Sequence, residues 1–148
     1  MADQKQLIGF QLGEGRVVFE SGKGSCLACH RIGNEGGLVG PDLSTIGRIR
    51  TARDLFESIL YPGESIARDF DTFEVTRNDG KPGLIGVVER QTASSLVMID
   101  AGGNRHEVPH SAVESRNRIG VSLMPPGLEQ TLSSKELNDL VAYLISLK

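Results

Sequence analysis

The sequence has little aromatic volume and little positive charge. Its 148 residues include five Phe, two Tyr and no Trp, which is thin for an all-protein core and would fit a flat apolar prosthetic group that fills part of the interior. Its 16 Lys and Arg face 19 Asp and Glu, and the net charge is −3. Nucleic-acid binders normally carry a basic surplus or stripe, so this composition argues against a nucleic-acid partner.

Long apolar runs are also missing. The longest, "LVAYLISL", falls well short of the roughly 20 residues that span a bilayer, so we expect no membrane insertion. The first residues show no basic segment followed by an apolar one, and no secretory signal is visible. If the protein is exported, the chain is expected to be a piece of a longer protein or to have lost its signal.

Three segments have the apolar periodicity of helices. The first covers residues 7–20 and ends at the glycine-containing stretch "SGKGS". The second begins at Thr51, where Asp54 completes a capping-box pattern, and stops before Pro62. The last begins at Ser133, which forms a second capping box with Glu136. Residues 31–50 are rich in Gly and are predicted to form a loop.

Residues 70–118 have a different composition. Runs rich in β-forming residues at 73–76, 84–89, 96–99 and around 106–108 are separated by turn sequences such as "NDGKPG" and "DAGGN". They predict a meander or small barrel of four or five strands. We therefore expect a mainly α fold with a small antiparallel β insertion, in which residues 1–69 and 119–148 form a helical core and residues 70–118 form an inserted lobe.

Both cysteines lie in one short motif, "CLACH", which has several interpretations. A thioredoxin-like dithiol would follow a buried strand and open a helix, whereas here a predicted helix precedes and a glycine-rich stretch follows. A zinc site would need Cys26 and Cys29 plus two of His30, His106 and His110, and those spacings match no compact zinc module. A plain disulfide or a coincidence stays open as well.

A haem attachment site explains all three polar residues of the motif. Two thiols at this spacing can each add to one vinyl group of the porphyrin, and the adjacent His30 can then ligate the iron through Nε2. Covalent attachment of one haem c per chain would also explain how so short a chain retains a large cofactor. Haem attachment is therefore the favoured interpretation of Cys26, Cys29 and His30.

A second iron ligand could come from Met98, Met124, His106 or His110. Met98 stands in the predicted strand "SLVMID", where filling the core is its simplest role. The two histidines flank "EVP" and are most simply exposed or locally hydrogen-bonded. Met124 lies in "SLMPPGLE", where two prolines stiffen the backbone and limit the entropy lost on presenting a thioether to a metal. An ordinary apolar contact is the alternative for Met124.

These residues resemble those of the class I cytochromes c. In that family a Gly and an aromatic residue on the first helix pack against a Leu and a Tyr on the last, and Gly15, Phe19, Leu140 and Tyr143 have that spacing. The resemblance also covers Gly40-Pro41-Asp42-Leu43. It implies that the Pro41 carbonyl accepts a hydrogen bond from Nδ1–H of His30, that Leu43 touches the haem ring, and that Met124 is the distal ligand.

The β-rich residues depart from a simple cytochrome c and narrow the resemblance. "GPDLSTIG", "LFESILYPGESIA", "VPHSAVESR" and "SLMPPGLEQTLSSKELNDLVAYLISL" are together similar to haem-binding domains at the C-termini of large, often dehydrogenase-like, proteins of planctomycete and verrucomicrobial bacteria. The β insertion is expected to shield the haem edge or dock a partner, or else to stabilise the fold.

The resemblance implies a one-electron carrier rather than an enzyme. His30 and Met124 would be the two axial ligands, and electrons would pass from a fused dehydrogenase-like domain or another donor protein to a further acceptor. Haem c attachment implies a periplasmic or otherwise extracytoplasmic location. One alternative is a haem enzyme or a gas or redox sensor with an open or labile sixth position, and another is an interaction module whose cysteine pair is incidental.

Overall fold

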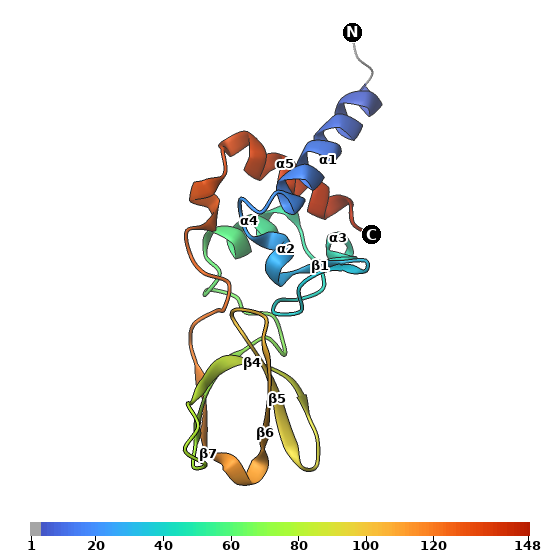
Figure 1. The fold of residues 1–148 in the computed structure, drawn as a ribbon. Helices are drawn as coiled ribbons and strands as arrows, with labels where there is room; N and C mark the ends of the chain where they lie inside the picture. The colour runs from blue at the N-terminus through green and yellow to red at the C-terminus, as the bar shows by residue number, and fades with distance from the viewer. Residues whose placement is uncertain (1–3) are drawn as a thin grey trace.

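The computed structural model describes residues 4–148, except the side chains of Lys5 and Leu7. Its helices gather at one end of the molecule and its larger sheet at the other, and α1 projects beyond the other helices (Figure 1). The helices are α1 (Gln4–Glu20), α2 (Cys26–Cys29), α3 (Ile46–Ile49), α4 (Ala52–Leu60) and α5 (Ser134–Ser146), with 3-10 turns η1 (His110–Ala112) and η2 (Leu128–Thr131). No helix within residues 4–148 has both the length and the apolar character needed to cross a membrane.

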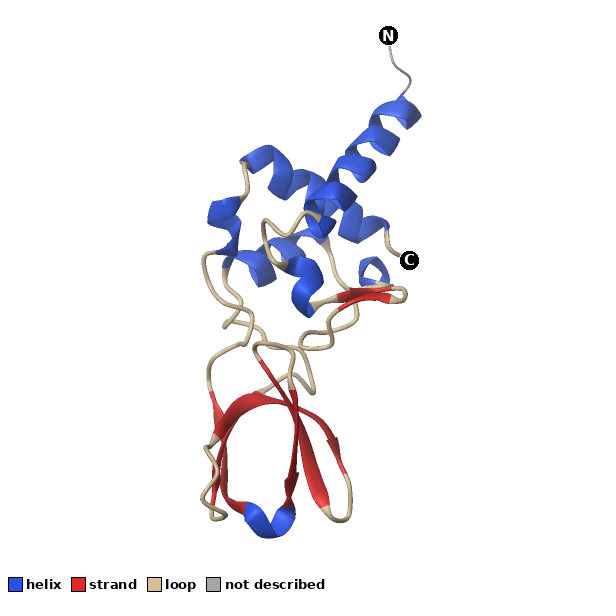
Figure 2. Ribbon diagram, in the orientation of Figure 1, coloured by secondary structure: helices blue, strands red, loops and turns tan. Residues whose placement is uncertain are grey.

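All the strands pair in antiparallel fashion, in two sheets coloured red in Figure 2. A two-stranded hairpin joins β1 (Arg31–Ile32) to β2 (Glu35–Gly36) directly after the CLACH motif. The larger sheet has the order β6-β5-β4-β3-β7. Its strands are β3 (Thr72–Arg77), β4 (Leu84–Gln91), β5 (Ser95–Asp100), β6 (Arg105–Pro109) and β7 (Val113–Ile119).

The predicted mainly α fold class is wrong. The protein is mixed, with 36% of its residues in helices and 25% in strands, and a five-stranded antiparallel sheet makes up one end of it. The strand runs extend beyond their predicted limits, and β7 adds a fifth strand on the far side of β3. Residues 31–50, expected as a loop, also contain the β1–β2 hairpin and the single turn of α3.

Two helices begin where the sequence predicts. Thr51 caps α4: its Oγ1 accepts a hydrogen bond from the Asp54 amide at 3.2 Å, and the Asp54 carboxylate accepts one from the Thr51 amide at 2.8 Å. Ser133 and Glu136 make the same reciprocal pair at the start of α5. Each capping box satisfies amide groups that the first turn of a helix leaves without partners.

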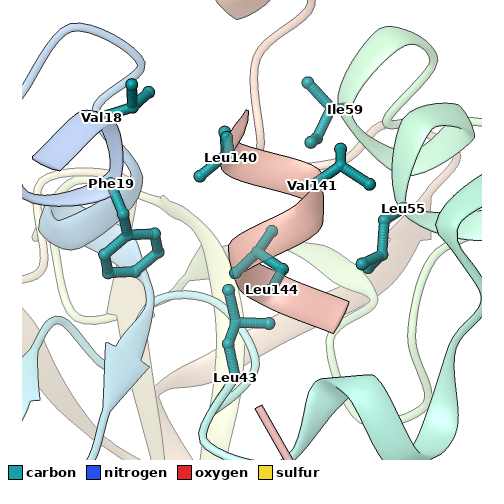
Figure 3. Close-up of a cluster of buried hydrophobic side chains, with 8 residues drawn as sticks. All are labelled: Val18, Phe19, Leu43, Leu55, Ile59, Leu140, Val141 and Leu144. Atoms are coloured by element: carbon teal, nitrogen blue, oxygen red, sulfur yellow. The ribbon is translucent and has the colours of Figure 1, made fainter. Parts of the chain in front are cut away.

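The helical end is built on the contact between α1 and α5. Gly15 of α1 lies so close to α5 that a Cβ there would come within 2.0 Å of the Asp139 carbonyl oxygen and 2.6 Å of Tyr143 Cβ. The Phe19 and Tyr143 rings lie beside this crossing, with their centroids 6.3 Å apart. Figure 3 shows the helical cluster that results, with α5 between α1 and α4. It comprises Val18, Phe19, Leu43, Leu55, Ile59, Leu140, Val141 and Leu144.

The larger sheet buries apolar residues on both faces. One face forms a cluster of its own, in which Val75, Leu96 and Met98 are almost wholly buried. On the other face, Val87 of β4 and Ile99 of β5 are paired in register and pack against Val39, which precedes Gly40. This second contact joins the sheet to the segment that follows the CLACH motif.

Candidate functional site

The CLACH motif forms a single helical turn followed by extended backbone. Cys26 and Cys29 are the first and last residues of α2, so their side chains lie three positions apart on one face of the turn. His30 leaves the helix with φ −109° and ψ 141°, and its amide donates a hydrogen bond to the Cys26 carbonyl at 2.8 Å. The backbone therefore presents two thiols together and directs the imidazole away from the helix.

The segment of residues 37–43 folds back along the motif. Its backbone amides donate hydrogen bonds to carbonyls of residues 27–31, namely Gly37 to Leu27 at 2.9 Å, Gly40 to Cys29 at 2.8 Å and Leu43 to Arg31 at 2.8 Å. Gly37 is required by this close approach, since a Cβ there would lie 2.0 Å from the Ala28 carbonyl oxygen. The glycines in "EGGLVG" thus allow residues 37–43 to lie directly against residues 27–31.

The His30 ring is held from two sides. Its Nδ1 lies 2.8 Å from the Pro41 carbonyl oxygen, which confirms the hydrogen bond expected from the sequence. A carbonyl oxygen can only accept, so Nδ1 is the donor, and in the neutral ring Nε2 keeps its lone pair for a metal. Gly40 lies against the ring, because a Cβ there would come within 2.6 Å of Cε1 and 2.9 Å of Nδ1.

The electrostatics of His30 favour the neutral ring. Burial lowers the pKa of the imidazole, and the hydrogen bond to the Pro41 carbonyl opposes this only in part. A neutral imidazole with a fixed Nδ1–H is the form in which histidine ligates metals. The structure thus presents His30 in the form that iron ligation requires.

Both cysteines are free thiols and both are half-buried. Burial raises the pKa of Cys26 and that of Cys29. A thioredoxin-like dithiol works by the opposite shift, because its reactive cysteine must be a thiolate near neutral pH. The zinc interpretation also lacks support, since no three His, Cys, Asp or Glu side chains within residues 4–148 are grouped so as to hold a metal.

Met124 is half-buried and packs against the helical cluster, as does Cys26. Leu43 belongs to the same cluster and is 9% exposed. The backbone at Met124 is held locally, since its amide donates to Ser122 Oγ at 3.1 Å. The structure therefore brings the thioether, the first thiol and the predicted ring-contacting leucine to one apolar cluster, although Met124 and Cys26 lie far apart in the sequence.

Met98 and His106 lie in the larger sheet, and His110 begins the 3-10 turn η1 that follows β6. Met98 is 1% exposed in the cluster with Val75 and Leu96, in agreement with a core-filling role. His106 Nε2 lies 2.7 Å from Asp100 Oδ2. His110 Nε2 lies 2.8 Å from the Thr92 carbonyl oxygen. Each of these side chains is used locally, which leaves Met124 as the candidate that shares a cluster with the CLACH motif.

The donor set fits a covalently attached haem. Cys26 and Met124 border the helical cluster, Cys29 lies on the same turn as Cys26, and the oriented His30 ring follows directly; two thiols, an imidazole and a thioether are the groups by which c-type haem is attached and ligated. A second set of contacts was not foreseen from the sequence: Cys29 and Leu123 both pack against Val39, Val87 and Ile99. The only signal for it was the apolar Leu38-Val39 pair in a glycine-rich stretch.

A scan against models of known protein families finds no match, and a search of curated proteins also finds none. The resemblance to cytochromes c therefore rests on the motifs in the sequence and stays a hypothesis.

Proposed function

We propose that the protein is a c-type cytochrome domain that carries single electrons. Cys26 and Cys29 would hold one haem through thioether bonds, and His30 and Met124 would ligate its iron. The observation that carries the proposal is the hydrogen bond of 2.8 Å between His30 Nδ1 and the Pro41 carbonyl, in a histidine that directly follows two free thiols on one helical face. The bound haem iron supplies the one-electron chemistry.

The surrounding residues would adjust the reduction potential. Met124 is a weak, neutral donor, and thioether ligation favours the reduced state relative to a second histidine. The apolar side chains of the helical cluster, including Leu43 and Ile59, disfavour additional positive charge in the same region. Both effects raise the potential, which suits a carrier that accepts electrons from a dehydrogenase-like domain or another donor protein.

An open-iron enzyme or sensor is the weaker interpretation. Such a function needs an open sixth position and usually a polar side chain above it to bind or activate the ligand. His106 and His110, the two histidines that could fill such a role, are already hydrogen-bonded, His106 to the Asp100 carboxylate and His110 to the Thr92 carbonyl. Met124 shares the cluster with Cys26 and offers a soft ligand that would close the position.

The location and partners follow from the proposed chemistry. By the resemblance to cytochromes c, haem is joined to reduced thiols outside the cytoplasm, so we propose a periplasmic or equivalent location. The partners are then an electron donor, either a fused dehydrogenase-like domain or a separate protein, and an electron acceptor.

Expression in a host that attaches haem to CLACH motifs tests the proposal. The haem should stay with the chain after denaturation, and the ferric protein should show the charge-transfer band of a methionine–iron bond. Met124→Leu keeps the side-chain volume and removes the sulfur, so this band should disappear and the ferrous protein should bind carbon monoxide. Met98→Leu makes the same chemical change in the sheet core and should leave ligation intact.

Two results would count against the proposal. A chain that carries no covalent haem in such a host is not a c-type cytochrome. Covalent haem with a band that survives in Met124→Leu would show that another residue is the sixth ligand, and the assignment of Met124 would be withdrawn.

A further inference from the structure

The larger sheet touches both segments that carry the proposed iron ligands. Val39, Val87 and Ile99, here called the bridging cluster, are each 3–4% exposed. Val87 and Ile99 are directly paired across β4 and β5, so their side chains lie on the same face of the sheet. Val39 comes from the segment that folds back along the CLACH motif. The bridging cluster is thus the apolar contact between the sheet and that segment.

On one side, the bridging cluster supports the CLACH motif and the segment that folds back along it. Cys29 packs against it. Val39 immediately precedes Gly40, whose amide donates to the Cys29 carbonyl at 2.8 Å and whose Cα lies against the His30 ring. A rigid contact at Val39 therefore fixes the backbone that surrounds the proposed proximal ligand.

On the other side, the bridging cluster holds the residue before Met124. Leu123 packs against it, whereas Met124 packs against the helical cluster. Adjacent residues thus anchor in two different apolar clusters. Only four residues, 120–123, separate the end of β7 at Ile119 from Met124, and Ile119 is paired in register with Thr72. The sheet therefore constrains this short connection at both Ile119 and Leu123.

We propose that Leu123, Val87 and Ile99 are positioning residues that hold the Met124 thioether on the iron. This inference rests on the proposed function. A thioether is a neutral and weak ligand, so its occupancy depends on the backbone being held at the correct distance. Leu123 supplies that restraint because its side chain is fixed on the sheet while the next side chain turns to the helical cluster. The sheet thus positions the sixth ligand, which is a more specific role than general stabilisation of the fold.

A matched pair of variants separates positioning from stability. Val87→Ala and Val75→Ala delete the same atoms from buried positions in neighbouring strands, but Val75 belongs to the cluster on the other face of the sheet. Both should lower the denaturant midpoint of unfolding. Only Val87→Ala, together with Leu123→Ala, should weaken the methionine–iron band and raise the carbon monoxide affinity of the ferrous protein. About tenfold is expected, the ratio that corresponds to about 1.4 kcal/mol.

The outcomes distinguish the two proposals. If the unmodified protein lacks the methionine–iron band, the proposed function fails, and this inference fails with it. Suppose instead that the unmodified protein has the band, and that Val87→Ala and Leu123→Ala match Val75→Ala in band intensity and carbon monoxide affinity. The positioning role is then refuted, while the proposed function stands. Should Val87→Ala fail to fold, Ile99→Val removes a single methylene from the bridging cluster and is judged by the same readouts.

Discussion

Replacing Gly40 with alanine tests how closely the His30 ring is held. A Cβ at position 40 would lie 2.6 Å from Cε1 and 2.9 Å from Nδ1 of the ring. Carbon atoms in ordinary contact are about 3.5 to 4.0 Å apart, so the overlap is about 1 Å. The ring cannot turn aside without lengthening its 2.8 Å hydrogen bond to the Pro41 carbonyl. Either the backbone of residues 39–41 moves or that hydrogen bond is lost.

Both responses have a measurable cost. Overpacking of a close contact destabilises by about 1 to 3 kcal/mol, and loss of a neutral hydrogen bond adds about 1 kcal/mol. Gly40→Ala should therefore lower the free energy of unfolding, measured by urea titration, by about 2 to 4 kcal/mol. In the haem-loaded protein the ferric spectrum should also change, since a displaced ring alters ligation by His30.

Gly63→Ala is the control for this prediction. A Cβ at position 63 meets nothing within 4 Å, so its effect on the free energy of unfolding should stay within about 0.5 kcal/mol, the range of ordinary surface substitutions. If Gly40→Ala is as stable as Gly63→Ala and keeps the unmodified spectrum, the ring is not packed against Gly40. The inference that residues 40 and 41 orient the imidazole would then be wrong.

Two further predictions concern the fold. Gly15→Ala should destabilise by about 1 to 3 kcal/mol in urea unfolding, because its Cβ would meet the Asp139 carbonyl oxygen at 2.0 Å. In the same helix a Cβ at Gly13 would meet nothing within 4 Å, so Gly13→Ala should raise the free energy of unfolding by up to about 1 kcal/mol. Equal changes in the two variants would contradict the close α1–α5 contact at Gly15. The Arg77 guanidinium donates a hydrogen bond to Asp79 and holds the pKa of that carboxyl at about 2, below its ordinary 3.8. This interaction therefore stabilises the fold fully above pH 3.8, and its contribution is lost as the pH falls toward 2. Asp79→Asn should flatten the pH dependence of unfolding in that interval, and an unchanged slope would refute this assignment.

Local patterns in the sequence predicted the parts of the structure that depend on local interactions. Thr51 and Ser133 begin their helices because each capping box is complete within four residues. The hydrogen bond of His30 to Pro41 was expected from a resemblance that itself consists of short motifs. These features do not depend on which strands pair, so short sequence patterns were sufficient to predict them.

The fold class failed where distant pairing decides the structure. β7 contains Glu114, Arg116 and Arg118, all exposed, and lacks the regular apolar alternation that marks a half-buried strand. Its stability comes from pairing with β3, and the Arg116 guanidinium lies over the Phe73 ring at 4.4 Å from its centroid. These partners lie some forty residues earlier in the chain. Local composition therefore underestimated how much of the protein is in strands.

The same limit explains why the support of the proposed sixth ligand was missed. Met124 stood out because two prolines follow it, which is a local signal. Leu123, Val39 and Ile99 are ordinary apolar residues, and their importance arises only when β4 and β5 pair and present one face to the segment after the CLACH motif. The sequence left three roles open for the sheet, namely shielding the haem edge, docking a partner and stabilising the fold; its contacts with Val39 and Leu123 are the basis of the positioning role proposed above. If Leu123 is held as proposed, the residues that would determine iron ligation include Val87 and Ile99 of the sheet, which is the part of the chain that does not resemble a simple cytochrome c.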